Sequence, residues 1–282
     1  MPRRRRRGSG LVEFALISLL LYVLLAGGID LGRMVFTAQV LNDAARVGAR
    51  ELALSPLPAS FTLTQALSQP DVTARVFDPA LLVLDMDDSG FETTRANLPL
   101  VNRALLPLMI VDFVTVAGIS RRFLRYPGAL LSSGSAFTVG IPRVLDRGPN
   151  GVETIEWIPV MEEVRCIEAG VPTTTFNLDS PCPQAGVAAI VINYPFQAAG
   201  LSGFRQNVAG PFEPNIGNPI AADDANVTEA NAAPGAPVNN EIAGPYAGPF
   251  GLGRQLAFAG QTLRPFRKLI SAQAIFRREV FE

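Results

Sequence analysis

The run from Phe14 to Ile29 is almost entirely apolar and carries no charged side chain. Extending the window to Leu11–Leu31 adds only two carboxylates, Glu13 and Asp30. About twenty helical residues rising 1.5 Å each match a hydrocarbon core of roughly 30 Å. A charge at the bilayer centre costs roughly 2.5–3.5 kcal/mol on insertion scales. We therefore expect a membrane-spanning helix with one carboxylate near each end.

Five consecutive arginines, Arg3–Arg7, precede this run. Basic residues beside a span stay on the cytoplasmic side, so the bulk of the chain is expected on the opposite side. A cleavable signal peptide has small residues just after its apolar segment. Ala26, Gly27 and Gly28 are small, but the helical pattern continues past them, and the acid at Glu13 is unusual for such a peptide. These features favour another kind of processing.

Gly8, Ser9, Glu13 and Phe14 form a different pattern: a basic leader, a glycine, four further residues, then Glu-Phe and an apolar helix. This pattern resembles the prepilin-peptidase site of Tad-pilus pseudopilins. The sequences at 28–33 (GIDLGR) and 44–50 (AARVGAR) are similar to the TadE-like family. Weaker similarities lie at 191–196 and 271–279.

The resemblance implies a minor pseudopilin of a Tad (Flp) pilus, cleaved after Gly8 by a prepilin peptidase and acting in pilus assembly. It implies a place in the bacterial inner membrane, with the other pilins or pseudopilins and the inner-membrane assembly platform as partners. Among packed helices a buried carboxylate at Glu13 needs a partner. The freed ammonium of Ser9, in the same or a neighbouring subunit, could supply it. The alternative is a carboxylate at the headgroup level with no role.

The helical pattern continues beyond the span until Ser55-Pro56 and Pro58 end it. One stripe of mostly small residues, from Met34 to Leu52, recurs at steps of four and three. The exported domain is expected on this stripe, with Arg33, Asn42, Arg46 and Arg50 on the opposite face. Within the span, Gly28 and Gly32 form a small-xxx-small pair that permits helix contact. The candidate helix-packing residues are Gly28, Gly32, Ala38, Leu41, Ala45 and Gly48.

The residue content argues against catalysis. The 282 residues have a formal net charge of −1, no histidine and a single lysine, Lys268. Without histidine, Ser-His-Asp and Cys-His arrangements are impossible. No phosphate-cradling glycine loop lies between a strand and a helix, and the only dense basic run is the leader, which argues against nucleic-acid binding. We expect neither enzymatic activity nor a cofactor.

The two cysteines, Cys166 and Cys182, are expected to form a disulfide if the domain is exported to an oxidising compartment. The alternative is two unpaired buried thiols. A zinc site is poorly supported, because the chain has no further cysteine and no histidine. Asp85–Gly90 resembles the opening of a calcium loop, but position twelve is Ala96 rather than glutamate. An Asp-rich turn is the better interpretation.

Short elements are expected after the long helix. Thr62 and Gln65 have capping-box spacing and predict a short helix that stops before Pro70. A helix is expected around Leu100–Val111, and the Gly148–Gly151 turn predicts a hairpin between its flanking strands. Strands are predicted at 72–77, 137–144, 154–166, 186–194 and 269–281, with a further short apolar run at 80–84.

Together these features predict an α+β protein with a long N-terminal transmembrane helix and an exported domain containing a mainly antiparallel sheet and a few short helices. The expected segments are a leader at 1–8, the helix at 9–54 and the domain at 55–282. A Pro/Gly/Asn-rich loop insertion is expected at about 197–253, because its composition buries little apolar surface. The alternative function is a permanently anchored single-pass envelope protein with a domain that binds a ligand or partner.

Overall fold

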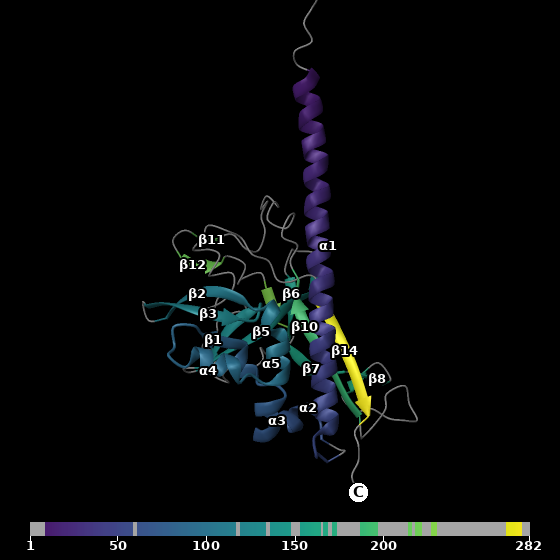
Figure 1. Cartoon of the computed structure of the whole chain (residues 1–282), viewed down its shortest axis with the longest axis vertical. Coiled ribbons are helices and arrows are strands. Elements are labelled where there is room, and N and C mark those ends of the chain that lie inside the picture. The colour runs from purple at the N-terminus through teal and green to yellow at the C-terminus, as the bar shows by residue number, and fades with distance from the viewer. Residues whose placement is uncertain are drawn as a thin grey trace, which may run out of the picture.

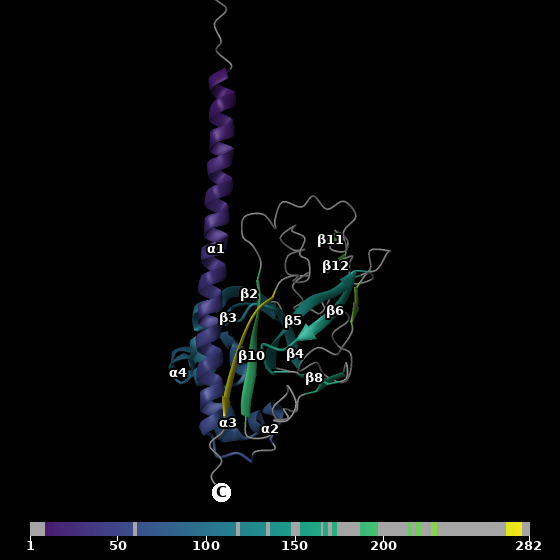
Figure 2. The same ribbon diagram turned by 90° about the vertical axis from the view of Figure 1, so that its right-hand side faces the viewer.

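A long helix, α1, carries an α+β body on its C-terminal half (Figure 1). In both views the N-terminal half of α1 extends beyond the labelled elements of the body (Figures 1 and 2). The predicted fold class is confirmed. The computed structural model describes residues 9–58, 61–116, 119–133, 136–147, 153–164, 166–168, 171–173, 187–196, 214–215, 218–221, 227–229 and 269–277.

Helix α1 (Ser9–Leu54) contains 46 residues and is about 69 Å long at 1.5 Å per residue. It ends at the predicted place. The Ser55 hydroxyl donates to the carbonyl of Glu51 at 2.8 Å, and Pro56 lacks the N–H that another helical turn would need.

The sheet on which α1 packs has β10 (Val187–Pro195) at its centre. Strand β14 (Leu269–Arg277) pairs with β10 antiparallel along all of β10, and β7 (Met161–Glu163) pairs with its other edge. Strands were predicted at both β10 and β14. Ala272 and Ala274 of β14 are buried, and such small side chains let α1 lie close to the sheet.

The predicted capping box is present at the start of α2 (Leu63–Leu67). The Thr62 hydroxyl accepts from the N–H of Gln65 at 3.3 Å, and the Gln65 side chain accepts from the N–H of Thr62 at 2.9 Å. The strand predicted at 72–77 is wrong, because α3 (Pro70–Arg75) occupies most of it. Proline in the first turn favours helix, and Val72 and Val76 are buried at helical spacing.

The helix predicted at Leu100–Val111 is wrong in its second half. Pro107 has no N–H to donate, and β-branched residues dominate from Ile110 onward, which favours a strand. The segment consists of α5 (Leu100–Leu105), the 3₁₀ turn η2 (Leu106–Leu108) and the start of β2 (Ile110–Val116). Upstream lie η1 (Pro79–Leu82), β1 (Val83–Asp85) and α4 (Phe91–Ala96).

Two further sheets of three and four strands lie in the described part of the body. β2 and β3 (Ile119–Arg125) form a hairpin, and β1 adds to the other edge of β3. The predicted hairpin is confirmed as antiparallel β5 (Ala136–Arg147) and β6 (Glu153–Ile158), with β4 (Ala129–Ser133) beside β5 and β13 (Val227–Glu229) parallel to β6. The strand predicted at 154–166 is interrupted at Pro159, so β6 and β7 are separate.

Two strand pairs are small: β8 (Cys166–Glu168) with β9 (Val171–Thr173), and β11 (Pro214–Asn215) with β12 (Asn218–Ala221). The predicted insertion at about 197–253 lies mostly outside the described residues; its described parts are β11, β12 and β13.

A partly buried polar network joins β10 to its neighbours. The Asn193 side chain donates to the Glu162 carboxylate at 2.8 Å and accepts from the Ser271 hydroxyl at 2.7 Å. The Tyr126 hydroxyl donates to the Asn193 carbonyl at 3.1 Å, and burial raises the pKa of Tyr126 well above its usual value. Because buried polar groups must be paired, this network fixes how the strands meet.

Candidate functional site

The N-terminal half of α1 is the candidate functional segment. Its apolar side chains are largely exposed to the surroundings, including Phe14 at 70% and Leu24 at 67%. A stretch of 18 residues within Val12–Leu54 is apolar enough to cross a membrane, and the body buries none of it. So large a continuous apolar surface is unfavourable in water. A single-pass membrane anchor explains it.

Charged side chains flank the apolar run on α1. Glu13 lies within the second turn of α1, and Asp30 pairs with Arg33 one turn later, at 3.9 Å. Arg33 also marks the junction with the body. Burial raises the pKa of Tyr194 on β10, and the positive charge of Arg33 opposes that rise. The apolar run therefore ends close to the body.

The C-terminal half of α1 is held by close packing. Leu41 and Ala45 are fully buried, and Gly48 lies where a Cβ would come within 2.7 Å of the Val101 side chain and 2.8 Å of the Ile190 side chain. Any larger residue at this position would force the side chains of Val101 and Ile190 to shift. Ala38, the remaining predicted packing residue in this half, is partly buried.

The predicted packing residues fall on two different faces of α1. Ala38, Leu41, Ala45 and Gly48 lie toward the body. Gly28 and Gly32 are exposed, and a Cβ added at either would meet no atom within 4 Å. The two glycines therefore take no part in holding the body and remain accessible to another molecule.

The predicted processing residues lie at the start of α1. Ser9 is the first described residue of α1, and Gly8 lies outside the described part of the chain. Glu13 and Phe14 are exposed, one turn into the helix. The described structure thus places the Glu-Phe pair on an extended helical end that projects from the body.

The predicted disulfide cannot be located in the structure. Cys166 begins β8, whereas Cys182 lies outside the described residues. The disulfide stays a prediction.

The Asp-rich turn is held by arginines. Asp85 pairs with Arg121 and Asp87 with Arg122, both at 2.7 Å. The N–H of Arg122 also donates to Asp87 at 2.9 Å. These hydrogen bonds, the backbone one foremost, lower the pKa of Asp87. Within the described ranges no group of three metal-ligating side chains occurs, and the turn acts as a clasp on β3.

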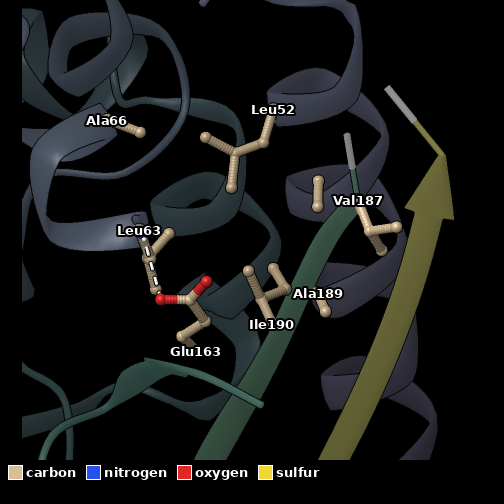
Figure 3. Close-up of a pocket in the computed structure, with 8 residues that line it drawn as sticks. Leu52, Leu63, Ala66, Glu163, Val187, Ala189 and Ile190 are labelled. Carbon is tan, nitrogen blue, oxygen red and sulfur yellow. Dashed lines mark hydrogen bonds between the residues drawn. The ribbon is translucent and has the colours of Figure 1, made fainter. Parts of the chain in front are cut away.

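A small pocket lies beneath the C-terminal end of α1 (Figure 3). Leu52, Leu63 and Ile190 line it, and the Glu163 carboxylate at its edge accepts from the N–H of Leu63 at 3.3 Å. The pocket encloses about 10 Å³, roughly the space of one water molecule. The pocket is a packing gap.

One contact that holds the end of α1 could not be predicted from the sequence. Arg75 pairs with Glu51 at 2.9 Å and donates to the Ser55 hydroxyl at 2.8 Å, so α3 ties down the end of the long helix. A basic residue in the last turn of a short helix was the only available signal, and it did not indicate the partner.

Comparison with known proteins found a similarity over this segment. Residues 8–50 match the family model described as TadE-like protein. This segment is similar to TadE-like proteins. The TadE-like match begins at the predicted cleavage glycine and ends within the docked half of α1, so it covers the projecting end, the apolar run and most of the packing stripe. Neither the search of curated proteins nor that of solved structures found a match.

Proposed function

We propose that this chain is a minor pseudopilin of a Tad-type pilus. In this proposal it enters the inner membrane with its N-terminus in the cytoplasm, a prepilin peptidase cleaves it between Gly8 and Ser9, and it then acts in pilus assembly. Its partners are other pilins or pseudopilins and the inner-membrane assembly platform. The role involves no catalysis.

The observation that carries the proposal is the match over residues 8–50 together with the projecting helix. The TadE-like match associates the chain with the Tad pilus, and Ser9, the residue that cleavage would expose, lies in α1. A helix whose apolar half is free of its own body can lie in a bilayer first. It can then exchange lipid for neighbouring helices, since both surroundings are apolar.

The N-terminal residue of the mature protein tests the proposal. Mass analysis of membrane-extracted protein should find a chain that begins at Ser9. Gly8→Phe should leave the arginine leader attached, because the peptidase must fit closely around the backbone at the scissile bond. Gly10→Phe, two residues further on, is the matched control and should still be cleaved. A native start at Met1, or after Gly28, would refute the pseudopilin role.

A further inference from the structure

The side of α1 that points away from the body forms one continuous surface, here called the outward face. Its members recur at steps of four and three residues, which keeps them in line on a helix. All of them are exposed. The outward face consists of Gly28, Gly32, Phe36, Gln39, Asp43, Arg46 and Arg50.

The part beyond the span carries both signs of charge. Asp43, Arg46 and Arg50 take part in none of the ion pairs between described residues. The three-residue spacing of Asp43 and Arg46 does not explain why they form no ion pair with each other. Acid and arginine three residues apart do pair elsewhere on the helices, at Asp30–Arg33 (3.9 Å) and Glu92–Arg95 (2.8 Å).

We propose that the outward face pairs with the outward face of a second copy of this chain, as two parallel helices. Asp43 of each copy would then oppose Arg46 of the other. These residues differ by about 4.5 Å along the axis, and their side chains span the 8–10 Å between packed helices. Two-fold symmetry makes this contact twice.

The rest of the outward face permits this arrangement. Two copies inserted in the same direction are necessarily parallel, and Gly28 and Gly32 allow the backbones to approach within the membrane. Arg50 would lie at the same level in both copies, but it is exposed to water, where salt screens the repulsion.

A second copy fits better than an unrelated acidic partner, because the face holds a carboxylate among its arginines and is complementary to itself. The described part of the body does not obstruct the approach, since it packs on the opposite side through Leu41 and Ala45. The inference rests on the proposed function only in requiring α1 to span a membrane.

Photo-crosslinking between two differently tagged copies tests the pairing. The photoreactive residue p-benzoylphenylalanine is placed at Gln39, on the outward face, and at Asn42 as the matched control. Asn42 is exposed at nearly the same depth but lies to one side. Irradiation of intact membranes should yield a product carrying both tags from position 39, about tenfold more than from position 42, which corresponds to 1.4 kcal/mol.

Charge reversal then tests the cross-copy contact. Asp43→Arg in both copies should reduce the product from position 39 about tenfold, because two exposed ion pairs become two repulsions. The double variant Asp43→Arg with Arg46→Asp should restore it, since the signs are exchanged on both sides. Membrane levels of each variant serve as the folding control.

Equal crosslinking at positions 39 and 42, no product carrying both tags, or no rescue by the double variant would each overturn the pairing. The mature N-terminus is measured in the same samples. A chain that starts at Ser9 without forming the dimer would contradict this inference alone, and a dimer of chains that start at Met1 would contradict only the proposed function.

Discussion

The buried charge of Arg125 is held by acceptors on neighbouring parts of the chain. Arg125 is buried, with 2% of its surface exposed, and it donates to Asp112 at 2.6 Å and to the carbonyl of Gly128 at 2.9 Å. A buried guanidinium without such acceptors would be strongly destabilising. The sequence contains both residues of the pair but no pattern that couples them. Thr62 and Gln65, by contrast, could be predicted, because a capping box needs only adjacent turns.

The Asp87 clasp makes a prediction about acid stability. Hydrogen bonds from the Arg122 N–H and guanidinium lower the pKa of Asp87 in the folded protein. The stability that they contribute is therefore complete above the usual aspartate pKa of about 3.9. It is lost as the pH falls through the lower folded value. Asp87→Asn should lower stability at neutral pH and flatten the decline in acid.

Thermal unfolding of the detergent-solubilised protein, measured between about pH 2 and pH 7, checks this prediction. Asp71→Asn is the control, because Asp71 is exposed and makes no ion pair with the described residues. An unchanged pH dependence in the Asp87 variant would contradict the clasp.

Among the elements, long ones could be predicted and short ones often could not. The apolar run and its continuation predict α1 because 46 residues of consistent pattern outweigh local ambiguity. Segments of six residues, such as α3 and α5, are too short for a period to decide, and tertiary packing sets their conformation. The β2–β3 hairpin was missed because its apolar residues continue directly from those of α5.

Gly48 is the point at which three elements come closest, and replacing it tests how α1 is held. Gly48→Leu should destabilise the body by about 1–3 kcal/mol or more, because the new side chain overlaps Val101 and Ile190. Gly32→Leu is the matched control on the open face and should leave body stability nearly unchanged. Unfolding of the purified protein in detergent measures both. Equal stability of the two variants would contradict the close approach.

Cys166 and Cys182 remain predicted to form a disulfide between the β8 segment and the chain that leads to β10. Closing the loop from Cys166 to Cys182 should stabilise the folded protein by roughly 3 kcal/mol in the chain-entropy model. Peptide mapping of the exported protein without reductant should find the linked pair, and the same digest after reduction is the control. Two thiols that react with an alkylating reagent in the unreduced protein would refute the bond.

At the scale of the whole molecule, α1 connects the membrane-spanning segment to the α+β body. The body first buries the helix at Thr37, six residues after Leu31, so about 9 Å of helix separates the span from the body. The domain is therefore held close to the membrane surface. The candidate site could be located from the sequence because its residues form one continuous segment of the chain. The orientation of its two faces could not, because that depends on which side the sheet covers.

A substitution at Glu13 tests whether the whole molecule acts in pilus assembly. We expect its carboxylate to serve assembly rather than insertion. Glu13→Gln removes a charge at the membrane edge, so insertion should be unharmed or slightly easier, and cleavage should persist if the peptidase recognises Gly8. Docking beside another subunit should fail, because that subunit's Ser9 ammonium would lose its counter-charge. An unpaired buried charge costs roughly 3–5 kcal/mol, which is enough to abolish assembly.

A pilus assembly assay on Glu13→Gln, run beside its membrane level and mature N-terminus, measures the effect. Ser18→Ala is the control, an exposed polar change in the same span that removes no charge. The expected result is a stable, processed protein that supports few or no pili, while the control assembles normally. Normal pili from processed Glu13→Gln protein would show that the carboxylate lies at the headgroup boundary without a role, because an interface that needed it would not tolerate a neutral amide.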